Sequence, residues 1–237
     1  MDRIAGRIPV LESLRAKKRK ARRLFVLREG RGFEAILEAA KGLPIETRSR
    51  MELDMLVEGG VHQGVVLEAD PLPLCRAEDW VKRDFGPNDL VVVLDSIEDP
   101  QNFGAIVRSA VACGACGVVF GKDRSAPIST VSQKSAAGAM EYVDLVQATN
   151  VVRCLEGLKQ AGFWVAALDP EGKQVLWDAD LKGKIALVIG NEGKGIRRLV
   201  HEHCDLHLRI PLTGPIPSLN ASVSAAIALA ECLRQRV

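Results

Sequence analysis

Residues 186–196 read Ala-Leu-Val-Ile-Gly-Asn-Glu-Gly-Lys-Gly-Ile, an apolar run that passes directly into a glycine-rich turn. Continuous apolar runs also occur at residues 90–94, 117–120, 164–168 and 206–210. Strands that are apolar on both faces and separated by helical stretches are typical of a parallel sheet that helices cover on both sides. The sequence therefore predicts an α/β domain with a ligand site at the carboxyl ends of its strands.

A smaller α/β unit is expected in the first seventy residues. Periodicity and capping signals predict three helices and three strands there: helices over residues 9–20 and 33–40, one from the capping box at Ser49 to Gly59-Gly60, and strands over residues 24–27, 45–47 and 65–67. Residues 70–89 are rich in prolines and charges, which is typical of a linker. We therefore expect a small domain over residues 1–70, a linker over residues 71–86 and a larger domain over residues 87–237.

Charge is distributed unevenly along the chain. The 32 basic and 30 acidic residues leave a formal net charge of +2. Residues 1–31 contain eleven of the basic and three of the acidic residues, a net charge of +8, so the remaining residues carry −6. Because clustered cations displace counterions from a polyanion, this segment predicts a nucleic-acid or anionic-membrane partner, with a solvated helix face as the alternative.

Composition excludes several classes of protein. With 47% hydrophobic and 26% charged residues in a chain of 237, disorder, collagen and a disulfide miniprotein are all excluded. The charge-dense N-terminus lacks the apolar core of a signal peptide, and no apolar stretch approaches the ~18 residues of a membrane span. We therefore expect a cytoplasmic protein without a membrane partner, whose six cysteines are reduced thiols.

Two short patterns are similar to metal or redox motifs without completing one. Cys113-Gly-Ala-Cys116 lacks a second ligand pair, and its glycine is expected to end a helix rather than open one. His201-Glu-His203-Cys204, with His207 nearby, lacks the His-Glu-x-x-His spacing, and residues two apart point to different sides of a helix. We therefore expect ordinary helix-surface histidines and no metal ion.

The loop over residues 95–110 has the first set of ligand-binding features. Asn102 is expected to cap a helix, and Arg108 would lie one turn into that helix among apolar and small side chains. A guanidinium in a cleft needs an anion. Either a ligand supplies that anion, or Arg108 forms a structural ion pair with Asp95 or Glu98.

Two later loops have similar features. The glycines at positions 190, 193 and 195 match neither the P-loop nor the dinucleotide fingerprint, which disfavours ATP and NAD. The loop over residues 210–224 contains three prolines and then Ser218, Asn220 and Ser222, more polar groups than one helix cap requires. This excess of polar groups predicts a ligand site.

The last helix is predicted to have two distinct faces. Its apolar positions Leu219, Val223, Ile227, Ala230 and Leu233 follow helical spacing. A second face consists of the small residues Ala221, Ala225 and Ala228. Small side chains allow close packing, and we expect this second face to suit a second subunit.

Three segments occur in a characteristic order: Asn102-x-Gly-Ala-x-x-Arg108, Gly190-Asn-Glu-Gly-x-Gly195, and Ile210-Pro-Leu212 followed by Ser218-Leu-Asn-x-Ser-Val223. Together they resemble the three motifs of the SpoU (TrmH-like) branch of the SPOUT RNA methyltransferases. Two N-terminal segments, Gly6-Arg-x-Pro-Val10 and His62-Gln-Gly-Val-Val66, are similar to the substrate-binding domain of the subgroup that methylates guanosine 2′-hydroxyls in bacterial large-subunit rRNA. The resemblance therefore covers both expected domains.

The resemblance implies a SPOUT catalytic domain of parallel strands over residues 87–237, with a deep C-terminal trefoil knot, and a small N-terminal RNA-binding domain like those of ribosomal proteins. In the family, the knot forms the pocket for the cofactor S-adenosylmethionine. The cofactor-binding residues implied in this chain are Gly190, Asn191, Ile210, Leu212, Leu219 and Ser224. The family also forms homodimers through the helix of the first motif and the C-terminal helix.

The implied reaction is methyl transfer to the ribose 2′-hydroxyl of a guanosine in 23S rRNA. Such a transfer needs an in-line approach and the loss of a proton from a very weak acid. The catalytic residues that the resemblance implies are Asn102, Arg108, Glu192, Ser218 and Asn220. Arg108 would lie closest to the proton, but an arginine pKa above ~12 makes an awkward general base. A phosphate contact and stabilisation of the developing alkoxide are the open alternatives for Arg108.

RNA phosphates are expected along the basic segment of the small domain, at Arg7, Arg15, Lys17, Lys18, Arg19, Lys20, Arg22 and Arg23. A tRNA nucleotide, or an rRNA site methylated for antibiotic resistance, is the alternative substrate. The alternative function is a non-catalytic RNA-binding or ribosome-assembly protein. A nicotinamide-dependent oxidoreductase is disfavoured because the glycine fingerprint is missing.

Overall fold

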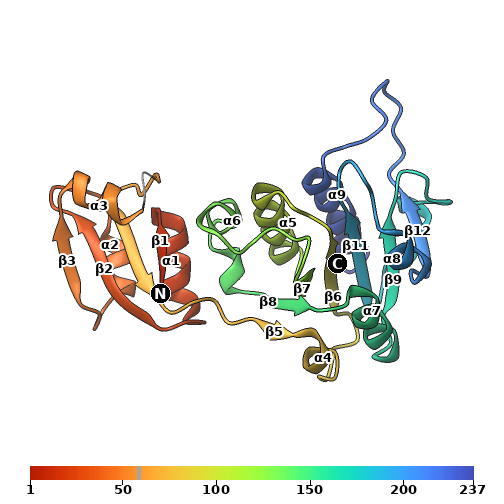
Figure 1. The fold of residues 1–237 in the computed structure, drawn as a ribbon, viewed down its shortest axis with the longest axis horizontal. Coiled ribbons are helices and arrows are strands. Elements are labelled where there is room, and N and C mark those ends of the chain that lie inside the picture. The colour runs from red at the N-terminus through yellow and green to blue at the C-terminus, as the bar shows by residue number, and fades with distance from the viewer. Residues whose placement is uncertain (58–59) are drawn as a thin grey trace.

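The computed structural model describes residues 1–57 and 60–237, which form two α/β domains (Figure 1). Gly59, one of the two glycines at which the third helix is expected to stop, lies outside the described residues. Across the described residues, every helix is too short or too polar to cross a membrane.

The small domain is built on a four-stranded sheet. Its elements are β1 (Asp2–Ala5), α1 (Arg7–Ala16), β2 (Ala21–Leu27), α2 (Glu34–Ala39), β3 (Ile45–Arg48), α3 (Arg50–Leu56) and β4 (Val65–Ala69). The strand order is β1-β4-β2-β3, in which β2 and β3 are parallel and the other pairs are antiparallel. The expected α/β character is confirmed, and β1, which the sequence patterns do not predict, is an additional edge strand.

The first helix differs from its prediction at both ends. α1 begins at Arg7 and ends at Ala16, whereas the pattern predicts residues 9–20. Lys17 takes the left-handed backbone conformation (φ 53°), and its N–H donates to the Ser13 carbonyl (3.3 Å), which ends the helix. The basic residues that follow therefore lie in a connection between α1 and β2.

The large domain is built on an eight-stranded sheet. Its elements are β5 (Cys75–Arg76), α4 (Ala77–Trp80), β6 (Leu90–Asp95), α5 (Pro100–Ala112), β7 (Ala115–Gly121), α6 (Thr130–Ala136), η1 (Ala139–Glu141), β8 (Asp144–Ala148), α7 (Val151–Gln160), β9 (Trp164–Leu168), β10 (Gln174–Val175), η2 (Leu176–Asp178), β11 (Ile185–Gly190), α8 (Arg198–Glu202), β12 (Leu206–Arg209) and α9 (Ala221–Arg234). The order is β10-β12-β9-β11-β6-β7-β8-β5, and all these pairs are parallel.

Helices cover both faces of this sheet, as predicted. In β6, Val92 and Leu94 belong to the core cluster that α5 and α9 close, whereas Val91 and Val93 belong to the cluster that α7 and α8 close. All four side chains are fully buried. A strand that is buried on both faces has no polar positions to alternate with, which explains the continuous apolar runs in the sequence.

The segment over residues 71–86 is more structured than the expected linker. β5 pairs with β8, with Cys75 opposite Val146, and so forms one edge of the large sheet. Trp80 in α4 is buried where Gly117 leaves room for its ring, and its indole N–H donates to Asp144 (2.9 Å). A strand of only two residues leaves no periodic pattern, so the sequence could not indicate it.

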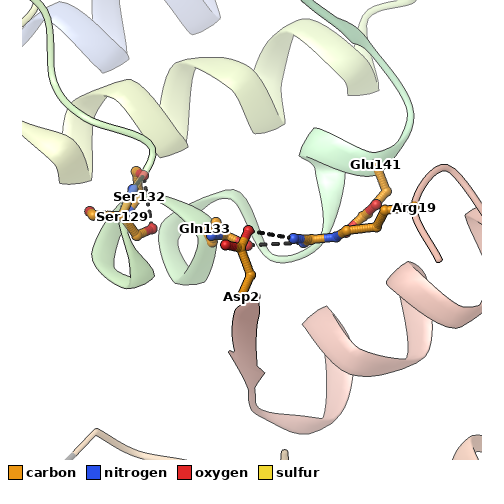
Figure 2. Close-up of polar contacts among 6 residues, drawn as sticks. All are labelled: Asp2, Arg19, Ser129, Ser132, Gln133 and Glu141. Carbon is orange, nitrogen blue, oxygen red and sulfur yellow. Dashed lines mark hydrogen bonds and ion pairs between the residues drawn. The ribbon is translucent and has the colours of Figure 1, made fainter. Parts of the chain in front are cut away.

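A buried ion pair holds the two domains together (Figure 2). The Arg19 guanidinium donates to Glu141 at 2.6 and 2.8 Å, and the two side chains are 3% and 2% exposed. The same guanidinium donates to Asp2 and to Gln133, each at 2.9 Å. Arg19 and Asp2 belong to the small domain, and Glu141 and Gln133 to the large one. Arg19 is therefore unavailable to an RNA phosphate, which corrects one of the predicted RNA-binding residues.

Helix α6 connects this junction to the helix of the first motif. Ser129 and Ser132 form a capping box at the start of α6, close to the Arg19 cluster (Figure 2). α6 lies directly on α5, because a Cβ at Gly104 would be 2.3 Å from the Ser132 carbonyl oxygen. Only glycine permits this approach. The docked small domain is thus in contact, through α6, with the helix that contains Asn102 and Arg108.

Replacing Arg19 should show how strongly the junction stabilises the protein. Arg19→Met leaves the Glu141 carboxylate buried without its partner, so we expect the free energy of unfolding to fall by about 3–5 kcal/mol. The double variant Arg19→Met/Glu141→Leu removes both charges and should recover most of that loss. Urea unfolding measures the two single variants, Arg19→Met and Glu141→Leu, and the double variant. A double variant as unstable as the sum of the two single variants would contradict coupling between these side chains.

Candidate active site

The three motif segments meet at the carboxyl edge of the large sheet. β6 ends at Asp95 and is followed by α5, β11 ends at Gly190 and is followed by the glycine turn, and β12 ends at Arg209 and is followed by the proline-rich loop. β6 and β11 are neighbouring strands, and β9 separates β11 from β12. The sheet order therefore brings together segments that are far apart in the sequence.

One carboxylate oxygen, Oε1 of Glu192, joins the three segments. The Asn102 side-chain amide donates to it at 2.6 Å, the Asn220 side-chain amide also donates to it, and the Ala221 backbone N–H lies 3.2 Å away. Asn220 Nδ2 donates in addition to Asn102 Oδ1 at 3.1 Å. Three of the five predicted catalytic residues are thus in direct contact.

Asn102 reaches Glu192 because it does not cap its own helix. The predicted cap at Asn102 is wrong: α5 begins at Pro100, and the Asp99 carboxylate accepts from the backbone N–H groups of Gln101 (3.1 Å) and Asn102 (3.2 Å). Proline at the first helical position and an acidic cap form a stronger helix start than asparagine two residues later. The Asn102 amide is therefore free to bond across the site.

Asn220 has two roles that use opposite ends of its amide. Its Oδ1 accepts from the backbone N–H of Ser222 (2.9 Å) and of Val223 (3.3 Å), which caps α9. Its Nδ2 is the donor to Glu192 and Asn102. The cap fixes the orientation of the amide, so the nitrogen faces the other two motifs.

The glycine turn is held by Asn191. Asn191 and Gly195 exchange backbone hydrogen bonds of 3.0 and 2.8 Å, and Asn191 Oδ1 accepts from the N–H groups of Gly193 and Lys194. Asn191 Nδ2 donates to the Ser96 carbonyl (3.0 Å), which fastens the turn to the neighbouring strand end. A Cβ at Gly190 would lie 2.5 Å from the Gly195 carbonyl carbon, so the turn closes only over glycine.

The buried carboxylate of Asp95 supports the other side of this turn. Asp95 is completely buried and accepts from the backbone N–H of Arg197 (2.7 Å) and from its Nε (2.6 Å). The predicted alternative, an ion pair between Asp95 and Arg108, is therefore wrong, because Asp95 forms its ion pair with Arg197. Arg197 and Asp99 are the supporting residues that sequence reasoning missed; only the Asp-Pro pair at the helix start could have indicated Asp99.

A pocket of about 700 Å³ lies beside the Glu192 cluster. The glycine turn and the segment from Arg209 to Ser224 line it together with residues 168–171, whereas the first-motif segment is not part of its lining. All six predicted cofactor-binding residues are among its lining residues, and so are two predicted catalytic residues: Gly190, Asn191, Ile210, Leu212, Leu219 and Ser224, with Glu192 and Ser218. The structure thus brings the predicted cofactor residues together in one cavity.

Arg108 lies apart from this cluster. It is the ninth residue of α5, so it lies about two turns into the helix instead of the predicted one turn, and it follows Asn102 by about 9 Å of helical rise. Its side chain is exposed, and within residues 1–57 and 60–237 it forms no hydrogen bond or ion pair, including none with Glu98. Arg108 is therefore not enclosed in a cleft as predicted, and its guanidinium is open to an anion from outside the chain.

The two faces of α9 are the reverse of what the sequence indicates. Ala221, Ala225 and Ala228 are buried in the chain's own core on the side of α5, so they are not available to a second subunit. Val223 and Leu233, from the apolar positions predicted to follow helical spacing, are instead 47% and 37% exposed. The small residues are inside because α9 packs closely against α5.

The cysteine pair at the end of α5 does not have the properties of a redox site. Burial raises the pKa of the Cys116 thiol to about 11, and burial also raises the pKa of Cys113. A reactive cysteine needs a lowered pKa, so that the thiolate is present at neutral pH. Both thiols are free, and they differ in this respect from a redox-active Cys-x-x-Cys pair.

Two family models match this chain. The SpoU rRNA methylase family model matches residues 89–230, and a model of the RNA 2′-O ribose methyltransferase substrate-binding domain matches residues 3–75. The chain belongs to the SpoU rRNA methylase family. The fold class predicted from the motifs is thereby confirmed for both domains, while the trefoil knot stays a prediction.

Individual relatives agree with this membership. The 23S rRNA (guanosine-2′-O-)-methyltransferase RlmB of Pseudomonas aeruginosa is 41% identical over 243 residues, covering 99% of this chain and 97% of that protein. The crystal structure of the SpoU methyltransferase AviRb from Streptomyces viridochromogenes, in complex with the cofactor AdoMet, has a TM-score of 0.82 at 24% identity and covers 99% of this chain and 89% of that chain. A structure concerned with 2-OH methylation of C/U34 on tRNA has a TM-score of 0.58 at 30% identity and covers 64% of this chain and 98% of that chain.

Two substitutions at Asn220 should separate its two roles. Asn220→Ala removes the helix cap, and we expect the free energy of unfolding to fall by about 1 kcal/mol. Asn220→Ser keeps a capping oxygen but is too short to reach Glu192, so its stability should stay close to that of the unchanged protein. Urea unfolding measures both. Equal destabilisation by serine and alanine would mean that the cap is not what Asn220 contributes to stability.

Proposed function

We propose that the chain transfers the methyl group of S-adenosylmethionine to the 2′-hydroxyl of a guanosine ribose in 23S rRNA. The observation that carries this proposal is the convergence of Asn102, Glu192 and Asn220 beside the pocket of about 700 Å³. The function named for the P. aeruginosa relative, which spans nearly the whole of this chain, supports the same substrate. A protein that acts on rRNA would work in the cytoplasm.

The pocket suits S-adenosylmethionine in size and chemistry. Its volume lies within the range of about 300–1,000 Å³ that is usual for small-molecule sites. Ile189, Ile210 and Leu219 supply apolar surface for an adenine ring, and the carboxylates of Glu171 and Glu192 supply negative charge for a cation. When bound, the cofactor supplies a methyl group on a positively charged sulfur. The AdoMet complex of AviRb supports this choice.

The residues of this chain would act mainly by positioning. The Glu192 cluster fixes the glycine turn and the start of α9 on either side of the pocket, and Ser218 adds a hydroxyl to its lining. An in-line transfer to oxygen depends on such fixed geometry. The guanidinium of Arg108 would bind an RNA phosphate or stabilise the developing alkoxide, since it is too weak an acid to serve readily as a base.

We infer that the active unit is a homodimer formed through the large domain. Arg108 has no partner among the described residues, and the exposed side chains of Val223 and Leu233 lie on α9, which packs against α5. A second copy placed on this surface would cover both apolar side chains. Light scattering measures the oligomeric state directly.

The small domain would hold the RNA backbone. Among its predicted phosphate contacts, Lys17 and Lys20 are exposed, while Lys18 is half-buried and bonds to the Val143 carbonyl. Arg7 donates to Gln63 and to the Arg31 carbonyl, so it also supports the fold. Three further predicted contacts are exposed arginines with one acidic partner each: Arg15 with Glu12, Arg22 with Asp70, and Arg23 with Glu46. Exposed ion pairs contribute only about 0–1 kcal/mol, so a phosphate could replace these carboxylates.

The small domain also favours rRNA over tRNA. The match to the tRNA-related structure extends over 98% of that chain but only 64% of this one. Residues 87–237 make up the same share of this chain, so a protein of that size has no counterpart of the small domain. The P. aeruginosa relative matches the small domain as well. A domain that adds phosphate contacts would extend the RNA surface that the protein binds.

Methyl transfer and the role of Arg108 can be tested together. With radiolabelled S-adenosylmethionine and 23S rRNA that lacks its modifications, we expect methyl incorporation into the RNA. Arg108→Ala should lower kcat by at least about 100-fold, because a transition-state contact is lost, and leave the affinity for S-adenosylhomocysteine unchanged. Loss of that affinity would make Arg108 structural. Retained RNA binding without any incorporation by the unchanged protein would support the non-catalytic alternative.

Lys17 and Lys20 give a separate test of RNA binding. The variant Lys17→Ala/Lys20→Ala should raise the Kd for 23S rRNA fragments and reduce the slope of log K against log salt by about 1.4–1.8, because two phosphate contacts are lost. Lys182→Ala, which removes an exposed lysine of the large domain, is the matched control. An equal effect in the control would place RNA binding outside the small domain.

A further inference from the structure

Asp169, His201 and His207 form a cluster outside the Glu192 site. One possible ligand atom from each side chain lies within 4.8 Å of the other two. His201 Nε2 is 2.8 Å from Asp169 Oδ2, and the imidazole rings of His201 and His207 have centroids 4.0 Å apart. The three residues come from three different parts of the fold: the end of β9, helix α8 and strand β12.

The pairing of β9 with β12 brings these residues to one face of the sheet. His207 is opposite Ala167, and Leu208 is opposite Leu168. Because side chains alternate along a strand, Asp169 continues on the face of Ala167, as does His207. Ala167 packs in the core cluster that contains Val200 of α8, so this is the face that α8 covers. The cluster is therefore fixed by strand register and not by the local spacing of the histidines.

The polar atoms of this cluster have unused bonding capacity. His207 Nδ1 is buried and has no hydrogen-bond partner among the described residues. Asp169 Oδ1 accepts from the Glu171 backbone N–H (2.9 Å), which turns the carboxylate and leaves Oδ2 for His201. Leaving a buried polar atom unpaired is unfavourable, so Nδ1 of His207 is available to bind a ligand beside Asp169 and His201.

We propose that Asp169, His201 and His207 bind a divalent transition-metal ion, with Zn²⁺ as the expected ion. Two imidazole nitrogens and one carboxylate oxygen are a ligand set that suits Zn²⁺, and three protein ligands leave a fourth position for water. Tetrahedral bonds of about 2.0–2.2 Å require donor atoms about 3.4 Å apart, so small side-chain rotations complete the site. His201 is 37% exposed, which gives the ion a route from solvent.

The sequence spacing could not indicate this site because the third ligand is distant. Asp169 precedes His201 by 32 residues, and it lies in no motif with the histidines. His203, which the local pattern places beside His201, is instead turned away: its Nδ1 bonds to the Leu199 carbonyl (2.7 Å), and its Nε2 lies 3.5 Å from Glu156. The interpretation of these histidines as ordinary helix-surface residues is wrong for His207, which lies in strand β12.

A bound ion would act on the wall of the cofactor pocket. Asp169 and Glu171 are lining residues of that pocket, whereas His201 and His207 lie behind it on α8 and β12. Coordination would fasten the end of β9 to α8 and stiffen this wall. The ion would thus be structural, and methyl transfer would not depend on a metal-bound water.

Zinc binding by the full-length protein tests the proposal. After dialysis against a chelator, competition with a chromophoric chelator should show one Zn²⁺ bound per chain and a rise in Tm. His201→Asn and His207→Asn should each weaken Zn²⁺ binding at least tenfold and abolish the Tm rise. His203→Asn, which removes the neighbouring histidine outside the cluster, is the matched control and should bind Zn²⁺ as the unchanged protein does.

Cobalt substitution identifies the ligands independently, since the chain also has six cysteines. Co²⁺ should give the visible absorption of a tetrahedral or five-coordinate site without a thiolate-to-metal band. A thiolate band, or unchanged Zn²⁺ affinity in His207→Asn, would overturn the proposal. If a histidine variant proves unfolded by circular dichroism in chelator, Asp169→Asn, which keeps the shape of the side chain, replaces it in the same test.

Discussion

The carboxylate of Glu192 is the interaction on which the site depends. Its Oε1 accepts hydrogen bonds from Asn102 on α5, from Asn220 at the start of α9 and from the Ala221 backbone. The acceptor and its donors lie on segments that further hydrogen bonds hold in place: the glycine turn by Asn191, the start of α5 by the Asp99 cap and the start of α9 by the Asn220 cap. The glycine turn and the start of α9 line the pocket, and Oε1 of Glu192 joins them to each other and to α5.

A second constraint fixes the small domain to this site. Arg19, the most buried cation of the basic segment, is used for the junction with Glu141, and α6 carries that junction to α5. The positive charge of the N-terminal segment therefore divides into two uses. The buried guanidinium of Arg19 stabilises the contact between the domains, and the exposed lysines and arginines remain available to the RNA backbone. Net charge along the sequence could not separate these uses, because it contains no information about burial.

The sequence predicts the features that local patterns determine and misses those that depend on contacts between distant segments. Strands β6 and β11 could be predicted because burial on both faces leaves a continuous apolar run, and the motif residues could be assigned from the family resemblance. β1 and β5 are short and carry no such pattern. The cap of α5, the partner of Asp95 and the buried alanines of α9 all depend on which distant segment packs alongside, and that is decided by the sheet order.

Ribose methylation mapped across 23S rRNA and tRNA tests the central claim most directly. The RNA would come from a strain that lacks this protein and from the same strain complemented with the unchanged protein or with Glu192→Ala. We predict that one guanosine of 23S rRNA lacks its 2′-O-methyl group in the deletion strain, regains it with the unchanged protein and does not regain it with Glu192→Ala. An unchanged 23S rRNA pattern, or a methyl group missing only from tRNA, would contradict the account.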